Sequence, residues 1–225
     1  LSAELVATLS PTVFLGYESL QGEGLRVLAI VRDGQAVDPL QAGESATLIL
    51  DRTPFYAESG GQVGDHGRLL GAAAQFDVSD TQKLAGVYFG HVGTLAQGSL
   101  KAGDVLSAEV DSARRQAIVL NHSATHLLHA ALREVLGDHV AQKGSQVAPE
   151  RLRFDFSHFQ PMSALELSRV EALVNAEIRR NVAVEVHHMG MQEALDFGAM
   201  ALFGEKYGEE VRVLKMGAFS TELCG

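Results

Sequence analysis

The chain has 225 residues, of which 46% are hydrophobic, and it carries a formal net charge of −10 at pH 7. This length accommodates one large domain or two small ones with a packed core, and the overall negative charge opposes polyanions unless basic residues gather in a local patch. No stretch approaches the ~18 apolar residues of a membrane span, and no basic segment precedes an apolar run at the N-terminus, so neither a membrane helix nor a signal peptide is expected.

Short strands separated by glycine-bearing turns are predicted from Thr12 to Asp111. The expected strands, rich in β-branched or aromatic residues, cover 12–20, 25–32, 46–50, 74–79, 87–92 and 105–110. Turns are expected at Gln21–Gly24 and at Asp33–Gly34. Strands that recur at such short spacing predict a small antiparallel β-barrel.

A glycine-rich stretch from Phe55 to Gly67 lies within this predicted barrel and contains Gly60, Gly61 and Gln62. Glycine permits a tight loop whose backbone N–H groups can face a ligand. A plain hairpin connection explains the same residues and is the favoured interpretation of this stretch taken alone. Because no lysine follows in the order of a Walker motif, a nucleotide-binding P-loop is not expected.

The hydrophobic period changes from 2 to 3.6 near Asp111, which predicts a domain boundary there and a long helix that ends near Leu136. Asp111 is the expected N-cap. His122, His126 and His129 fall within about 60° of one another on the helical wheel. The residues that cluster on the opposite side are apolar: Ala117, Leu120, Ala124, Leu127, Leu128, Ala131 and Val135. We therefore expect these apolar residues, and not the histidines, to pack the helix into the main core.

His122 and His126 are spaced so that their imidazoles can aim nitrogens at one metal ion. A lone helical histidine is more often a solvated or core residue, and a His-x-x-x-His pair also arises by chance in a chain with nine histidines. The pair by itself leaves a metal site and a structural role equally open. Ser123 stands where a metalloprotease of the His-Glu-x-x-His type carries its general base, which argues against that class.

The remainder of the chain mixes strands and helices without strict alternation, which predicts an α+β domain. Strands are expected at 139–147, 151–157, 182–186 and 211–216, and a short helix at 191–197. Ser163 and Glu166 form a capping box that begins a second helix, expected to run to about Arg180. The single cysteine, Cys224, excludes an internal disulfide and fits a reducing cytoplasm.

Several segments carry a joint resemblance to a known family. They are Gly60–Gly67, Asn121–His126, Gln142–Ser145, Arg151–His158, Gly198–Gly208 and Ser220–Gly225. Together they closely resemble the editing domain of bacterial alanyl-tRNA synthetase, with Gly60–Gly67 similar to the family's glycine-rich motif. The matches cover nearly the whole chain in the family's order. They imply an α+β fold in which a small antiparallel β-barrel, residues 1–111, precedes an α+β editing core, residues 112–225.

The resemblance implies a zinc-dependent deacylase that hydrolyses the ester of tRNA(Ala) mischarged with serine or glycine. The family's His-x-x-x-His matches His122 and His126 as zinc ligands, and the first residue of its Cys-x-x-x-His matches Cys224. The second histidine of that motif is missing, since the sequence stops one residue after Cys224. We therefore expect this chain, truncated at its C-terminal zinc motif, to bind zinc weakly or not at all.

The resemblance also implies roles for residues around the zinc ligands. Thr125 and Gln142 are expected to border the pocket and to act in substrate recognition or water positioning, although a hydroxyl bonded back to its own helix explains Thr125 equally well. His129 is interpreted as an ordinary helix-face histidine in preference to a support for a metal ligand. The residues expected to bind substrate are Gly60, Gly61 and Gln62, together with the basic Lys143, Arg151, Arg153 and Lys206, whose charges are more often simply solvated.

The implied partners are the acceptor end of tRNA(Ala) carrying serine or glycine and the remaining domains of a parent synthetase, and the expected location is cytoplasmic. A freestanding editing protein of the AlaX type is one alternative. Because the first residue is Leu1 and not methionine, a segment of a longer chain is favoured over it. A non-catalytic tRNA-binding module with structural zinc is the second alternative.

Overall fold

The computed structural model describes residues 1–201 and 207–224 and forms two compact units. The first unit comprises Leu1–Ser59 and Val63–Ala117, and the second comprises Gly60–Gln62 and Ile118–Gly225. A piece of the glycine-rich stretch, Gly60–Gln62, therefore belongs to the second unit. Among the described residues, every helix falls short of the length and apolar character that crossing a bilayer requires.

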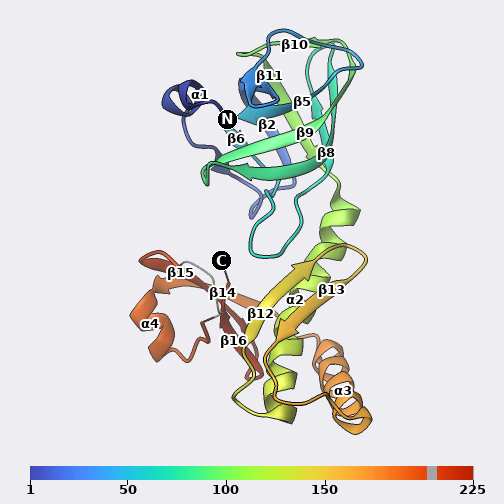
Figure 1. The fold of residues 1–225 in the computed structure, drawn as a ribbon, viewed down its shortest axis with the longest axis vertical. Coiled ribbons are helices and arrows are strands. Elements are labelled where there is room, and N and C mark those ends of the chain that lie inside the picture. Colours follow the sequence, from blue (N-terminus) through green and yellow to red (C-terminus); the bar gives the residue numbers. More distant parts are fainter. Residues whose placement is uncertain (202–206, 225) are drawn as a thin grey trace. The chain divides into compact units, whose positions relative to one another are not determined.

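The first unit is a small β-barrel preceded by a short helix (Figure 1). Its elements are α1 (Ala3–Thr8), β1 (Val13–Phe14), β2 (Gln21–Arg32), β3 (Gln35–Ala36), β4 (Leu40–Gln41), β5 (Ser45–Leu50), β6 (Arg52–Thr53), β7 (Gly67–Leu70), β8 (Gln75–Leu84), β9 (Tyr88–Gln97), β10 (Ser99–Leu100), β11 (Val105–Val110) and the start of α2 (Ser112–Leu136). Six strands of this fully described unit run antiparallel in the order β11–β7–β8–β9–β5–β2, and pairing of β11 with β2 closes the ring. The predicted barrel is therefore confirmed.

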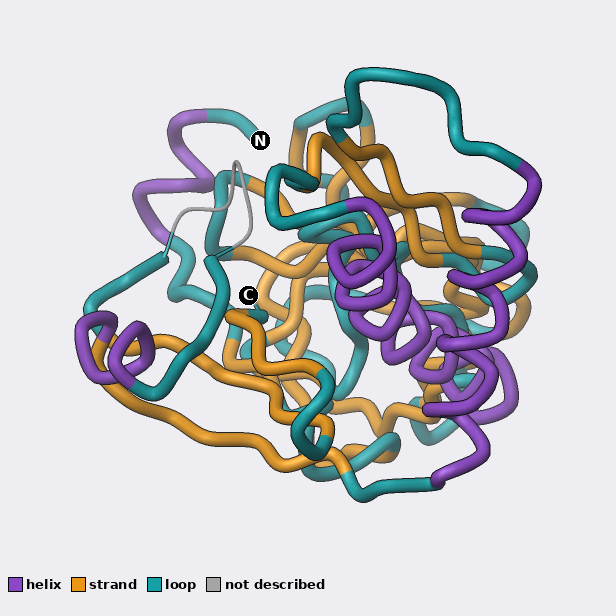
Figure 2. Tube along the Cα trace, turned by 90° about the horizontal axis from the view of Figure 1, so that it is seen from below, coloured by secondary structure: helices purple, strands orange, loops and turns teal. Residues whose placement is uncertain are grey.

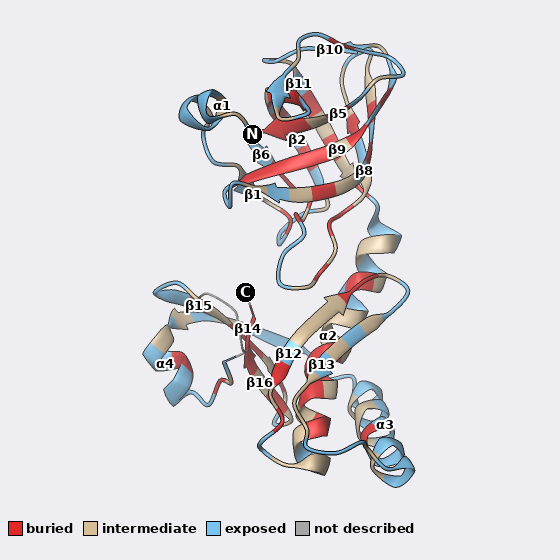
Figure 3. Ribbon diagram, viewed as in Figure 1, coloured by how far each residue is buried: buried red, intermediate tan, exposed pale blue. Residues whose placement is uncertain are grey.

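The barrel core is built from side chains that alternate along the strands. Leu25, Leu48, Leu69, Phe76 and Leu95 come from five different strands, and each is 0% exposed. In Figure 3 buried residues follow these strands, and β9 is buried without a break from Tyr88 to His91. The predicted period of 2 therefore describes only part of the burial along the strands.

The structure corrects two predicted boundaries in the barrel. Gln21–Gly24, expected as a turn, is the first part of β2, which pairs with β11 there and with β5 farther along. Gly24 has a φ of +64° in this stretch, so a glycine marks a bend within a continuous strand instead of a turn. The expected strand 12–20 shortens to β1, because only Val13 and Phe14 pair, in parallel, with β6.

A buried histidine forms part of the barrel core. His91 is 0% exposed; its Nδ1 donates to the Leu48 carbonyl at 2.9 Å, and its Nε2 accepts from the Thr53 hydroxyl at 2.7 Å. Burial lowers the pKa of His91 from 6.5 to about 4, against the opposing effect of the Leu48 hydrogen bond. The ring is therefore neutral in the folded protein at pH 7.

We expect the barrel to lose stability as the pH falls from 6.5 to 4. Between these pH values His91 binds a proton in the unfolded chain but stays neutral in the folded protein. This difference lowers the unfolding free energy by ~3 kcal/mol in total. Urea unfolding of the wild type and of His91→Gln at several pH values measures this. The variant should lose much of the slope, whereas His66→Gln, which alters a half-buried histidine of the same unit, should retain most of it. Parallel curves for the wild type and His91→Gln would contradict the assignment.

In its described residues, the second unit combines α2 with two small sheets and two further helices (Figure 1). Its remaining elements are β12 (Gln142–Val147), β13 (Leu152–Phe156), α3 (Ala164–Arg180), β14 (Val184–Gly190), α4 (Met191–Asp196), β15 (Glu210–Met216) and β16 (Ser220–Leu223). β12 and β13 form a hairpin, and β14, β15 and β16 form an antiparallel sheet in that order. The predicted α+β class is confirmed.

Helices α2 and α3 lie side by side and share an apolar cluster with the β12–β13 hairpin (Figure 2). Ala131 and Leu132 of α2 meet Val170 of α3 in this cluster. The predicted capping box begins α3: the Ser163 hydroxyl accepts from the Glu166 N–H at 3.2 Å, and the Glu166 carboxylate accepts from the Ser163 N–H at 2.8 Å. The predicted N-cap of α2 is also present, since Asp111 accepts from the Arg114 N–H at 2.9 Å.

The predicted core face of α2 is buried only in part, and the histidine side is buried as well. His126 and His129 are 4% and 2% exposed, whereas Leu120, placed on the expected core face, is 61% exposed. Leu127 and Ala131 are buried as expected. The helical wheel finds the apolar side correctly, but the histidine side is buried too, because it meets polar partners from a distant strand.

Candidate metal centre

Two segments far apart in the sequence meet at the histidine face of α2. His122 and His126 lie one turn apart with stacked rings, whose centroids are 5.1 Å apart. Strand β16 ends at Leu223, so Cys224 follows directly, and its N–H donates to the Arg212 carbonyl of β15 at 2.9 Å. The side chain of Cys224 is thereby held at the two histidines.

The donor atoms of these three residues form a compact group. The ligand atoms of His122, His126 and Cys224 all lie within 4.8 Å of one another, and Cys224 Sγ is 3.3 Å from His122 Nε2. In a tetrahedral zinc site with ordinary Zn–N and Zn–S bonds, nitrogen and sulfur ligands are roughly 3.6 Å apart. The distance between Cys224 Sγ and His122 Nε2 is therefore close to one edge of a zinc tetrahedron.

A buried carboxylate stands behind two of the histidines. Glu222, 1% exposed, accepts from His126 Nδ1 at 2.5 Å and from His129 Nδ1 at 2.7 Å. The interpretation of His129 as an ordinary helix-face histidine was thus wrong. The sequence holds a signal for Glu222, because residues two apart in a strand share a face, which places Glu222 beside Cys224.

The glycine-rich stretch supplies a second supporting contact. Gln62, expected to bind substrate with Gly60 and Gly61, bonds through its amide oxygen to His122 Nδ1 at 2.7 Å. The backbone of Gly61 accepts from the Val147 N–H of β12 at 2.8 Å. Gln62, in the part of the glycine-rich stretch that belongs to the second unit, therefore contacts a histidine of the metal group.

The titratable groups of the cluster perturb one another. Burial raises the pKa of the Cys224 thiol, but the hydrogen bond with His122 and the charge of His122 and His126 lower it by more, to about 6. Burial lowers the pKa of His126, whereas Cys224 and Glu222 raise it to about 10. Burial also raises the pKa of Glu222, yet His126 and His129 outweigh it and the net direction is downward. Two anionic groups, a thiolate and a carboxylate, are thus favoured at the site.

The residues present fit a zinc ion by donor chemistry and by an unsatisfied nitrogen. Nε2 of His126 is buried and has no hydrogen-bond partner among the described residues. Two imidazoles and a thiolate are the ligand types that zinc prefers in proteins. His122, His126 and Cys224 are therefore the residues that would hold it.

The two expected pocket residues are both buried in the second unit. Thr125 and Gln142 are each 8% exposed. The Thr125 hydroxyl donates to the Asn121 carbonyl at 2.8 Å, which is the back-bonded arrangement considered from sequence. The side-chain oxygen of Gln142 has no hydrogen-bond partner in the described structure, and a buried unpaired acceptor is unusual.

The basic residues expected to meet phosphates lie along the β12–β13 hairpin or next to it. Lys143, Arg151 and Arg153 are exposed. Arg153 Nε lies 3.1 Å from a carboxylate oxygen of Asp155, so part of its charge is balanced locally. Lys206 lies outside the described residues.

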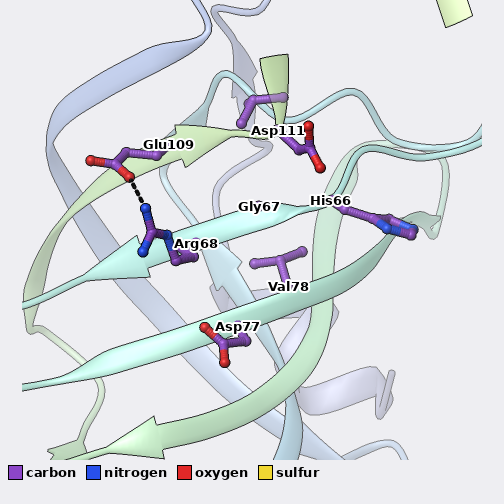
Figure 4. A pocket seen from close by; sticks show the side chains of 8 residues that line it. His66, Gly67, Arg68, Asp77, Val78, Glu109 and Asp111 are labelled. Carbon is purple, nitrogen blue, oxygen red and sulfur yellow. Dashed lines mark hydrogen bonds and ion pairs between the residues drawn. The ribbon is translucent and has the colours of Figure 1, made fainter. Parts of the chain in front are cut away.

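A cavity of about 440 Å³, which does not include the metal-centre residues, opens on the barrel of the first unit (Figure 4). Its polar lining includes His66, Arg68, Asp77 and Asp111, and Arg68 forms an ion pair with Glu109 at 2.9 Å. Burial lowers the pKa of His66, and the charge of Arg114 acts in the same direction. These side chains do not converge on one point in Figure 4, so this cavity lacks the arrangement seen at the metal centre.

Comparison with known proteins gives a consistent result. Residues 2–114 match the family described as tRNA synthetases class II (A). The whole chain is 69% identical to an alanine–tRNA ligase of Stenotrophomonas maltophilia and 66% identical to one of Xanthomonas campestris pv. campestris. In both cases it spans 26% of the relative's length. The chain therefore belongs to the alanyl-tRNA synthetases, a class II family of tRNA synthetases.

Proposed function

We propose that this chain is the hydrolytic editing domain of an alanyl-tRNA synthetase. Its substrates would be Ser-tRNA(Ala) and Gly-tRNA(Ala), and its reaction the cleavage of the ester that links the amino acid to the tRNA. The observation that carries the proposal is the approach of Cys224 to His122 and His126 beside the buried Thr125. In this reading residues 1–111 are the barrel domain and residues 112–225 the editing core of a cytoplasmic enzyme.

The need for such a site follows from the limits of recognition. A synthetic pocket that accepts alanine cannot exclude the smaller glycine, and one extra hydroxyl or missing methylene changes binding by only ~1–3 kcal/mol. A second site that recognises the error by different contacts multiplies the selectivity. The buried polar groups around α2 supply contacts of that kind.

A zinc ion bound by His122, His126 and Cys224 would supply Lewis-acid chemistry or a binding point for the substrate's amino group. The chain's own residues bind and orient the ester. The Thr125 hydroxyl donates its proton to Asn121, so its oxygen is left to accept a hydrogen bond from the serine hydroxyl. The unpaired oxygen of Gln142 is suited to orient a water or the substrate amine. Lys143, Arg151 and Arg153 are proposed contacts of the acceptor-end phosphates.

Incubation with charged tRNA tests the function directly. This chain, and a longer chain that includes the second histidine of the Cys-x-x-x-His motif, are mixed with Ser-tRNA(Ala) or Ala-tRNA(Ala), and free amino acid is measured. Selective release of serine is expected. Binding of tRNA by the longer chain without release would support a non-catalytic module instead.

Thr125→Val should reduce hydrolysis of Ser-tRNA(Ala) about 10-fold more than hydrolysis of Gly-tRNA(Ala). The substitution keeps the shape of the side chain but removes an acceptor that is worth about 1.4 kcal/mol only to the substrate with a hydroxyl. Single-turnover rates on both substrates measure the difference. Equal losses would mean that Thr125 supports the helix alone, through its bond to Asn121.

A further inference from the structure

We propose that Gln62 and Glu222 are positioning residues that fix the ring orientation and tautomer of the two histidine ligands, and that Gly61 is the residue that allows Gln62 to reach its histidine. This inference rests on the proposed metal site. It assigns to the glycine-rich stretch a contact that neither its sequence nor its hairpin-like composition predicts.

The chemistry of the Gln62 contact determines where the proton of His122 lies. The amide oxygen of Gln62 is 2.7 Å from His122 Nδ1, and an amide oxygen can only accept. Nδ1 of His122 therefore carries the proton. Nε2, which lies 3.3 Å from Cys224 Sγ, is then the nitrogen available to a metal.

The Glu222 contact acts in the same way on His126. Its carboxylate accepts from Nδ1 of His126 at 2.5 Å, which leaves Nε2 of that ring free, buried and without a hydrogen-bond partner in the described residues. His129 bonds to the other carboxylate oxygen at 2.7 Å. Because both carboxylate oxygens are engaged, the ring of His126 is held with Nε2, and not Nδ1, toward the metal group.

The backbone around Gly61 explains how Gln62 reaches this position. Gly61 has a φ of +83°, and a Cβ added there would lie 2.5 Å from the carbonyl oxygen of Ser145 and 2.6 Å from its hydroxyl. The close approach to β12 also permits the Val147 N–H to bond to Gly61. Any larger side chain at this position must push the loop away from β12. Gln62, the next residue, would then move away from His122.

Metal titration of matched variants, all made in the longer chain that includes the complete Cys-x-x-x-His motif, tests the proposal. Gln62→Met keeps the length of the side chain but removes the acceptor, and Glu222→Gln leaves an acceptor for only one of the two histidines. Gly61→Ala displaces the loop without touching a ligand. Each should weaken Co²⁺ and Zn²⁺ binding about 10- to 100-fold, the range expected when a ligand loses its supporting hydrogen bond. Gln62→Glu should retain binding, because a carboxylate can only accept.

Three control variants carry the same types of substitution at positions that have no contact with the metal group. Glu210→Gln alters an exposed carboxylate on β15, and Gln97→Met alters an exposed amide at the end of β9. Gly43→Ala imposes the same backbone strain, at a φ of +86°, where no atom lies within 4 Å of the added Cβ. All three should bind Co²⁺ with wild-type affinity.

Nitrogen NMR of the metal-free chain provides a second readout that does not depend on metal affinity. His122 should be protonated at Nδ1 in the wild type and in Gln62→Glu, and should populate both tautomers in Gln62→Met. If the wild type binds metal and folded Gln62→Met binds it equally well, the positioning role is wrong while the metal site stands. If neither this chain nor the longer one binds Co²⁺, the metal site fails, and the tautomer measurement still decides the role of Gln62.

Discussion

Replacing Arg115 with methionine should lower the unfolding free energy of the first unit by about 3–5 kcal/mol. The guanidinium donates from Nε to both oxygens of Asp65 at 3.0 Å, and its Nη2 also bonds to that carboxylate. It reaches the carbonyls of Gly16 and Pro54 at 3.0 and 3.1 Å as well. The side chain of Asp65 is 1% exposed, so removal of Arg115 leaves a buried charge without its counterion.

Urea unfolding followed by circular dichroism measures this loss. Arg68→Met is the matched control, since Arg68 forms an ion pair with Glu109 at 2.9 Å in which both side chains are about half exposed. That pair should contribute less than about 1 kcal/mol. The double variant Asp65→Asn with Arg115→Met should recover part of the stability, because the stranded charge is gone. Similar losses for Arg115→Met and Arg68→Met would show that burial of the pair does not control its contribution.

The Arg115 network also marks what the sequence could and could not predict. The barrel, the start of α2 and the capping box of α3 depend on local patterns: alternation, a change of period, and two residues three apart. The partners of Arg115 lie 50 to 99 residues away along the chain. No local pattern indicates which carboxylate or carbonyl a buried arginine will meet.

The metal centre likewise has one feature that a local pattern predicts and others that depend on distant residues. The spacing of His122 and His126 suggested a metal, but Cys224 was linked to them only by the resemblance to a family, since it lies 102 residues from His122. The burial of the histidine face was not predicted, because Glu222, the partner that makes burial of the histidines tolerable, lies on another element. Gln62 was assigned to substrate because glycine-rich loops commonly face ligands, whereas its amide is used by His122.

Substituting Cys224 with serine should abolish tight Zn²⁺ binding and slow the hydrolysis of Ser-tRNA(Ala) by more than about 100-fold. Serine keeps the size of the side chain but replaces a thiolate, favoured here by a pKa of about 6, with a hydroxyl that stays protonated at neutral pH. Without that anionic ligand the two imidazoles hold a divalent cation weakly, and the chemistry expected of the ion is lost. Zn²⁺ competition with a chromophoric chelator and single-turnover hydrolysis, both on the longer chain with the complete motif, measure the two losses.

Thr221→Val is the control for this substitution, because residue 221 precedes Glu222 on β16 and its side chain points to the other face of the strand. It should leave both metal binding and hydrolysis unchanged. The two readouts together separate the roles of the ion. If Cys224→Ser lost Zn²⁺ but still hydrolysed Ser-tRNA(Ala) at the wild-type rate, the reaction would be carried by the polar residues around α2, and the thiolate would serve only to fix β16 against the helix. Parallel loss of both is the result expected of a zinc-dependent deacylase.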